Sequence, residues 1–225
     1  MDRRTLMMGA GAGVMAAGSY ALLRPAHAPQ LPLLPQAAHA QDPSAATDLP
    51  VVVEMVLGNP DAPVEVIEYA SFTCPHCASF HRNTFPRIKE NYIDTDQVRF
   101  IYREVYFDRF GLWAGMVARC AGPDRYFGIV DLIYQRQADW TQGAPGAVAD
   151  NLRQIGRVAG LSDDQLEACL TDATTAQALI ANYEAQMEVH PIPGTPHFVI
   201  DGEMYSNMSY EDFVEILDTR IAAAQ

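Results

Sequence analysis

The sequence has little positive charge and no long apolar run beyond its first fifty residues. Lysine and arginine number 15 against 28 aspartates and glutamates, which gives a formal net charge of −13. The first forty residues contain three arginines and one aspartate, so residues 41–225 sum to 12 − 27 = −15. An acidic body of this kind repels nucleic acid and anionic membrane surfaces. We therefore expect no nucleic-acid partner. Because no long apolar run follows residue 50, we also expect no membrane-spanning segment there.

Cysteine is also scarce, with four residues at positions 74, 77, 120 and 169. Four cysteines allow three pairings, and the sequence does not choose among them. The two-residue gap makes Cys74 and Cys77 the local pair, which leaves Cys120 and Cys169 for each other. A structural disulfide is the favoured interpretation of this second pair, and a second redox pair or two buried free thiols remain open.

The scarcity of cysteine bears on metal binding as well. A structural zinc site usually needs four ligands and a second Cys-x-x-Cys pair, and no second pair follows. We predict no metal and no cofactor beyond the cysteines themselves. A permanently oxidised structural crosslink between Cys74 and Cys77 remains an alternative.

The N-terminus is typical of an export signal. It reads MDRRTLMMGAGAGVMAAGSYALLRPAHA, a charged start followed by a mildly apolar stretch and a small-residue site. Arg3 and Arg4 resemble a twin-arginine signal, and a permanent N-terminal anchor is the alternative. We interpret residues 1–40 as signal and leader, with Gln41 as the mature start, and the proline-containing residues 41–50 as a linker. The expected location is the periplasm, where disulfides persist.

The remaining chain alternates between strand and helix patterns. Apolar runs predict strands over 51–57, 64–69 and 98–103, and a helix-period pattern that Pro86 interrupts follows Cys74. Helical patterns fill 112–187, broken at glycine and proline residues. A hairpin around Asp201 and Gly202 and a helix capped at Ser209 complete the chain. The order predicts an α/β unit divided by a helical insertion.

The segment SFTCPHCASFH, residues 71–81, carries the most specific chemistry. If Cys74 is the N-cap and Pro75 the first helical residue, unpaired backbone N–H groups and the helix dipole favour a thiolate at Cys74. A protonated His76 imidazole would add a second positive group. Cys77, about one turn into the helix, would be shielded. One exposed thiolate and one sheltered thiol is the arrangement that disulfide exchange needs.

Cys-Pro-His-Cys in this setting resembles the active site of the DsbA-type thiol:disulfide oxidoreductases of the thioredoxin superfamily. The resemblance extends over most of residues 51–225. It implies a thioredoxin-like fold from 51–108 and 192–225, with a helical insertion at 109–191. It also implies that Glu68, on the incoming strand, is a buried acid that assists proton transfer, although an exposed strand-end glutamate remains possible from the residues alone. The stretch from Gly194 to Phe198 resembles the family's cis-proline loop.

The resemblance implies a function and partners. Cys74 would be the nucleophile, Cys77 the resolving cysteine, and Thr195 and Pro196 the element that binds a substrate strand. The substrates would be unfolded or reduced exported proteins, and a quinone-linked membrane oxidase would recycle the protein, which we expect to be a monomer. A disulfide isomerase or reductase is the alternative, since Thr195 stands where the best-known family member has valine. A peptide-binding chaperone without redox turnover is a further alternative.

Two histidines outside the motif have open roles in the sequence. His81 and His197 either line the active-site groove or are packed or surface residues without a direct role.

Overall fold

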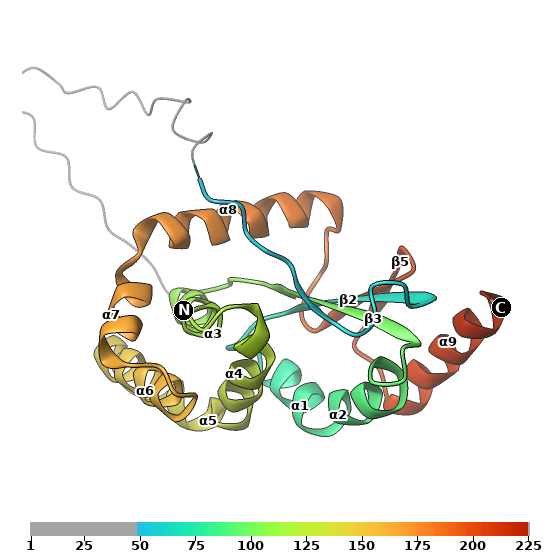
Figure 1. The fold of residues 1–225 in the computed structure, drawn as a ribbon, viewed down its shortest axis with the longest axis horizontal. Helices are drawn as coiled ribbons and strands as arrows, with labels where there is room; N and C mark the ends of the chain where they lie inside the picture. The colour runs from blue at the N-terminus through green and yellow to red at the C-terminus, as the bar shows by residue number, and fades with distance from the viewer. Residues whose placement is uncertain (1–48, 225) are drawn as a thin grey trace, which may run out of the picture. The chain divides into compact units, whose positions relative to one another are not determined.

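The computed structural model describes residues 49–224 (Figure 1). The strands are β1 (Met55–Leu57), β2 (Val64–Ala70), β3 (Val98–Glu104), β4 (His197–Ile200) and β5 (Glu203–Ser206). The helices are α1 (Pro75–Asn83), α2 (Phe85–Ile88), the π-helix η2 (Lys89–Ile93), α3 (Arg109–Arg119), α4 (Pro123–Gln135), α5 (Gln137–Trp140), α6 (Pro145–Val158), α7 (Asp163–Thr171), α8 (Ala173–Val189) and α9 (Tyr210–Ala223). The predicted signal and most of the predicted linker lie outside the described residues.

The five strands form one mixed sheet in the order β1-β3-β2-β4-β5. β2 and β3 run parallel, and the other pairs are antiparallel. β2 lies at the centre, as its apolar sequence predicts, because a strand buried on both faces has no solvent-facing positions.

Helices α1 and α9 lie on one side of the sheet and α8 lies on the other (Figure 1), and alternate residues of the central strands face these two layers. Val64, Val66 and Ala70 of β2 belong to the larger apolar core, with residues of α1, α4 and α9. Ile67 and Tyr69 belong to a smaller core against α8. Because side chains alternate along a strand, Glu68 shares the face of the larger core. That face is the one that α1 covers.

The first strand is shorter than the sequence predicts. Residues 51–57 form an apolar run, but β1 begins only at Met55. Val51 is 92% exposed and Val53 is 57% exposed. The carbonyl oxygen of Val53 accepts a hydrogen bond from Arg119 Nη1 at 2.8 Å. The Arg119 side chain therefore supplies the hydrogen bond that a neighbouring strand would otherwise make with the Val53 carbonyl group.

The helix after Cys74 is interrupted as predicted. α1 ends at Asn83, and α2 begins at Phe85 with Pro86 in its first turn. Proline lacks the N–H that would continue the α1 ladder, so the break falls just before it.

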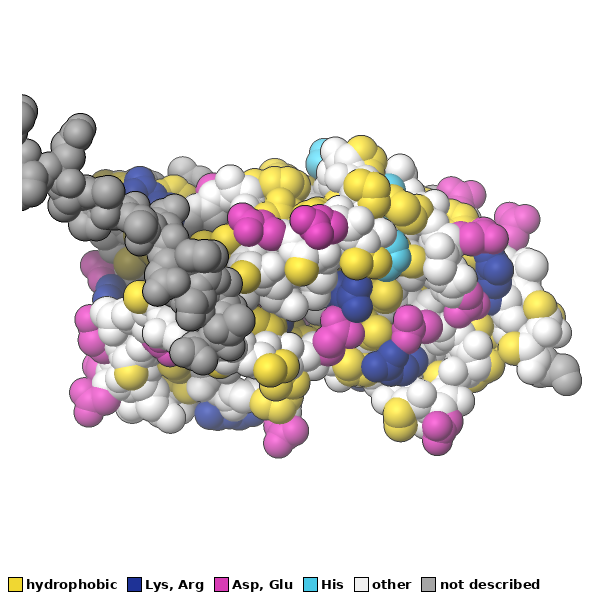
Figure 2. All heavy atoms as spheres, turned by 90° about the horizontal axis from the view of Figure 1, so that it is seen from above, with side chains coloured by type: hydrophobic (Ala, Val, Ile, Leu, Met, Phe, Trp, Pro, Cys, Tyr) yellow, Lys and Arg dark blue, Asp and Glu magenta, His cyan; other side chains and the backbone are white. Residues whose placement is uncertain are grey.

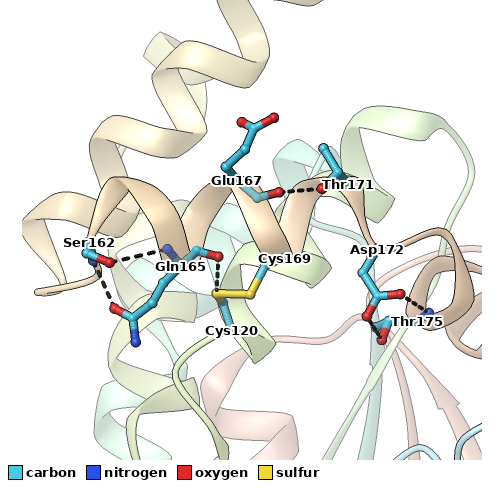
Figure 3. Close-up of a disulfide and its surroundings, with 8 residues drawn as sticks. All are labelled: Cys120, Ser162, Gln165, Glu167, Cys169, Thr171, Asp172 and Thr175. Carbon is cyan, nitrogen blue, oxygen red and sulfur yellow. Dashed lines mark hydrogen bonds between the residues drawn. A yellow bond between two sulfur atoms is a disulfide. The ribbon is translucent and has the colours of Figure 1, made fainter.

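Every element between β3 and β4 is helical. Cys120 ends α3 and Cys169 lies on α7, and their sulfurs are joined in a disulfide (Figure 3). Ser162 caps the N-terminus of α7 in a reciprocal pair with Gln165 (Figure 3). The division into a thioredoxin-like part and an insertion at residues 109–191 stays a prediction.

The surface reflects the acidic composition. On the face seen in Figure 2, Asp and Glu side chains are spread between apolar ones. Among residues 49–224, no helix combines the length and apolar character needed to cross a bilayer.

Candidate active site

The two cysteines lie where strand β2 passes into helix α1. Cys74 is the N-cap of α1, and Pro75 occupies its first turn. The backbone N–H of Cys74 donates to the Ser71 carbonyl at 3.1 Å, which closes a turn after the strand. Cys74 thus stands at the N-terminus of α1, as the sequence predicts, next to the free N–H groups of the first turn.

The two sulfurs have opposite environments. Both are free thiols, with Cys77 buried and Cys74 partly exposed. A hydrogen bond from the Cys77 thiol, aided by the nearby Thr195 side chain and by backbone N–H groups, lowers the pKa of Cys74 to about 5. Burial, first, and then the Cys74 sulfur raise the pKa of Cys77 far above its ordinary value. The first cysteine is therefore a thiolate at neutral pH, while the second stays protonated.

His76 acts on Cys74 through its backbone. The side chain is exposed, and it is the backbone N–H of His76 that contributes to the low pKa of Cys74. The oriented amides at the start of the helix supply this part of the stabilisation. The stabilisation by a protonated imidazole that the sequence suggested stays a prediction.

A loop far along the chain borders the Cys74 sulfur. The Thr195–Pro196 peptide bond is cis. In its protonated form the Cys74 sulfur donates to the Thr195 carbonyl oxygen at 3.2 Å, and Pro196 is buried. The hydroxyl of Thr195 is buried and has no hydrogen-bond partner among the described residues. The structure thus brings Thr195 and Pro196, which the sequence singled out, beside the cysteine pair.

Glu68 is fully buried beneath helix α1. Its Oε2 lies 2.8 Å from Nε2 of His81, which is 3% exposed. The negative charge of Glu68 also contributes to the raised pKa of Cys77. The exposed-glutamate alternative is wrong, because β2 is buried on both faces. His81 is a packed residue that pairs with Glu68.

His197 is also packed and lies on the other face of the sheet. It is 5% exposed, and burial lowers its pKa. The neutral ring therefore makes no charged contribution to the cysteine pair.

Gln137 of α5 holds the active-site loop from the helical region. Its Nε2 donates to the carbonyl oxygens of Phe72 at 2.7 Å and Cys74 at 2.9 Å. Sequence reasoning missed this residue, because no local pattern connects it to the motif. A cavity of about 470 Å³ lies beside this contact, lined in part by Thr73, Pro75, Arg82, Asp108, Phe110 and Gln137.

The described part of the chain contains no cluster of three or more histidine, cysteine, aspartate or glutamate side chains arranged to hold a metal ion. The groups that the structure does bring together are two sulfurs, a buried acid–histidine pair and a backbone edge.

The chain is similar to known redox proteins. Residues 51–219 match the family model described as thioredoxin. A Rickettsia bellii protein, provisionally named a protein-disulfide oxidoreductase, is 34% identical over 169 residues, which are 75% of this chain and 64% of that protein. The chain thus spans less than two thirds of the length of this curated relative. The disulfide bond formation protein D of Bacillus subtilis is 26% identical over 170 residues, which are 73% of this chain and 74% of that protein.

Solved structures show the same fold. The crystal structure of alpha-DsbA1 from Wolbachia pipientis has a TM-score of 0.68 and 30% identity, and the match covers 80% of this chain and 97% of that one. BdbD from Bacillus subtilis, in its oxidised form, has a TM-score of 0.64 at 22% identity, over 75% of this chain and 93% of that one. The second likeness shows the fold alone. Together the matches identify a thioredoxin-like fold of the kind that DsbA proteins have.

Proposed function

We propose that this chain donates a Cys74–Cys77 disulfide to reduced proteins. The proposal starts from the family: the chain belongs to the DsbA-type thiol:disulfide oxidoreductases of the thioredoxin superfamily. The observation that carries the proposal is the contrast between the two thiols. The pKa of Cys74 is lowered to about 5, while that of Cys77 is raised. A stabilised thiolate favours the reduced protein, so the oxidised protein gives its disulfide away.

The exchange has two steps. A substrate thiolate attacks the Cys74 sulfur, the Cys74–Cys77 bond breaks, and Cys77 leaves and takes up a proton. The second substrate thiolate then attacks the substrate sulfur of the mixed disulfide, and Cys74 leaves. Two electrons pass from the substrate to the protein. The low pKa of Cys74 speeds the second step, because a thiolate of lower pKa is a better leaving group.

The other site residues have supporting roles in this proposal. Pro75 and the His76 N–H start the helix that faces the Cys74 sulfur. Glu68 exchanges protons with Cys77, on which its charge already acts. Thr195 and Pro196 present an extended backbone next to Cys74, to which a substrate strand would add by main-chain hydrogen bonds.

The biological setting is also part of the proposal. The substrates are unfolded or reduced exported proteins, met in the periplasm after export, with the twin-arginine route as the favoured one. The Cys120–Cys169 disulfide supports this setting, because such bonds persist in oxidising compartments. A quinone-linked membrane oxidase recycles the reduced protein, which acts as a monomer.

An isomerase or reductase is the second candidate, and Thr195 favours it. The Thr195 hydroxyl lowers the pKa of both Cys74 and Cys77. Cys77 is the resolving cysteine, and its thiolate releases a substrate that is held in a mixed disulfide with Cys74. A group that stabilises the Cys77 thiolate therefore assists this release.

The equilibrium of the Cys74–Cys77 disulfide with glutathione separates the two candidates. A disulfide that glutathione reduces readily supports the oxidase, and one that resists reduction like that of thioredoxin overturns it. Oxidation of a reduced two-cysteine peptide, measured for the protein and for Cys74→Ser, tests the redox role itself. If both proteins bind the peptide but neither oxidises it, the protein is a binding module and not an oxidoreductase.

A further inference from the structure

His81 connects the buried acid Glu68 to a second cavity, remote from the cysteine opening. Cys77 and Glu68 are both 0% exposed, so neither exchanges protons directly with bulk water. The proton that Cys77 gains or loses therefore needs a path through other groups. His81 is 3% exposed, and its ring lines the edge of a cavity.

The positions of these groups follow from the helix period. Cys77 and His81 are four residues apart on α1, so their side chains lie on one face of the helix. Glu68 projects from β2 toward the same layer, where its Oε2 is 2.8 Å from His81 Nε2. Its other oxygen, Oε1, has no hydrogen-bond partner among the described residues. A buried carboxylate oxygen without a hydrogen-bond partner costs free energy, so this oxygen is available to a further group.

The cavity gives the relay an outlet. Its volume is about 300 Å³, far more than the space one water molecule occupies. Its lining consists of Leu57, His81, Phe85, Pro86, Lys89, Phe127, Gly128, Val130 and Asp131. Neither cysteine and neither residue of the Thr195–Pro196 loop belongs to this lining. Lys89, which also pairs with Asp94, and Asp131, which accepts a hydrogen bond from Gln135, bring charged groups to the same lining.

The two phenols packed around His81 are neutral and carry no charge that would hold a proton on its ring. The Tyr134 ring of α4 stacks on the imidazole with centroids 4.4 Å apart, and Tyr102 of β3 lies edge-on at 5.7 Å. Burial raises the pKa of both phenols well above the ordinary value, so both stay neutral. The Tyr102 and Tyr134 hydroxyls are 2.6 Å apart and hydrogen-bond each other. Glu68 is thus the charged partner that contacts the imidazole inside the core, and Lys89 and Asp131 are the charged groups at the cavity.

We propose that His81 transfers protons between Glu68 and this cavity, so that Cys77 is protonated and deprotonated through the protein interior. This inference rests on the proposed disulfide exchange. When the Cys74–Cys77 bond breaks, Cys77 takes a proton from the Glu68 carboxyl group. Glu68 recovers one from His81 Nε2, and the ring gains one at Nδ1 from water in the cavity. When the protein is reoxidised, each proton moves in the opposite direction.

The first test is the oxidation of a reduced two-cysteine peptide by His81→Gln and Glu68→Gln. Glutamine at position 81 keeps an N–H for Glu68 but does not relay protons as imidazole does. General acid–base assistance contributes roughly 10²–10⁴ to rates, so we expect His81→Gln to slow oxidation by at least about tenfold and to alter its pH profile. Alkylation of Cys74, which needs no proton at Cys77, keeps its rate. The double variant is as slow as Glu68→Gln alone, because both changes break one path.

The second test uses rescue through the cavity. Imidazole added to His81→Ala restores oxidation with saturation, since the vacated space is continuous with the cavity. Gly128 lines the cavity, and a Cβ atom added there would have no neighbour within 4 Å. In a His81→Ala background, Gly128→Leu fills this space and suppresses the rescue. His197→Ala, which removes a buried histidine on the other face of the sheet, is the matched control and shows no rescue.

The outcomes separate the inference from the proposed function. If the unchanged protein does not oxidise the peptide, the proposed function fails. If it does so, but His81→Gln keeps the unchanged rate and pH profile, the relay is wrong. Rescue that persists with Gly128→Leu would overturn the cavity as the route. If His81→Ala does not fold, as circular dichroism reports, the His81→Gln profile alone decides the matter.

Discussion

The Gln137 side chain donates a hydrogen bond of 2.9 Å to the carbonyl oxygen of Cys74, 63 residues earlier in the chain. The same nitrogen donates to Phe72 at 2.7 Å. Gln137 is 7% exposed, so water does not replace these bonds easily. The helical region thus holds the backbone that carries the reactive sulfur.

Gln137→Ala should destabilise the protein by roughly 1–3 kcal/mol, because it leaves two carbonyl groups of the active-site loop without their donor. Denaturant unfolding measures the change. Gln135→Ala, at an exposed position on the neighbouring helix, is the matched control and should shift stability by less than about 0.5 kcal/mol. Equal effects of the two changes would show that the contact with Cys74 contributes nothing.

Cys77→Ala should raise the pKa of Cys74 from about 5 toward its ordinary range, because the Cys77 thiol is the largest cause of the low value. Cys77→Ser keeps a hydroxyl donor and should raise it less. Thiolate absorbance in the ultraviolet and the pH dependence of alkylation both report the pKa. A Cys74 pKa that is the same in both variants and in the unchanged protein would contradict the assigned cause.

The reduced protein should become more stable as pH rises from about 5 to about 9. The pKa of Cys74 is lower in the folded state than the ordinary value of 9.0, so the unfolded chain binds more protons in this window. The stabilisation that Cys74 contributes is complete above the pKa that this thiol has in the unfolded chain. It is lost as the pH falls through the lower pKa of the folded protein. At pH 7 it amounts to roughly 3 kcal/mol before solvent screening, which reduces it for a partly exposed sulfur.

The measurement for this pH dependence is the unfolding free energy of the reduced protein minus that of Cys74→Ser, followed across pH. The subtraction removes groups common to both proteins, such as the buried histidines. A difference that stays flat between pH 5 and pH 9 would rule out the low Cys74 pKa.

Removal of the second disulfide by Cys120→Ala with Cys169→Ala should cost stability without ending peptide oxidation. The bond spans 49 residues, and closing a loop of about 50 residues stabilises by roughly 4 kcal/mol in the chain-entropy model. Denaturant unfolding of the oxidised proteins gives the difference. If the variant remains folded but no longer oxidises a peptide, Cys120 and Cys169 are a second redox pair and not a structural bond.

Arg119→Met should destabilise the fold by roughly 3–5 kcal/mol, because it leaves the Glu104 carboxylate buried without its partner. Two hydrogen bonds of 2.6 Å join these side chains, which are 12% and 4% exposed. Arg157→Met removes an ion pair with Asp163 whose side chains are 51% and 73% exposed, and it should cost less than about 1 kcal/mol. Thermal or denaturant unfolding of both variants measures the two losses of stability, and equal losses would contradict the prediction.

The sequence determined the features that arise between near neighbours in the chain. The Cys-Pro-His-Cys motif alone predicts that Cys74 is the N-cap of α1 and that Pro75 lies in its first turn. This is possible because an N-cap depends only on the next few N–H groups. The central place of β2 follows from its unbroken apolar character. The low pKa of Cys74 was predicted in direction, although the sequence did not identify the Cys77 thiol as its main cause.

Only the tertiary structure decided which distant groups meet. The sequence allowed three cysteine pairings, and the packing of α3 against α7 selects Cys120 with Cys169. Glu68 could have been exposed or buried, and the covering helix α1 both buries it and brings His81 to its Oε2. Nothing in the local pattern predicts that Gln137 reaches Cys74. Hydrogen bonds of this kind depend on how helices and strands pack, and packing is set by the whole core, which no short stretch of sequence contains.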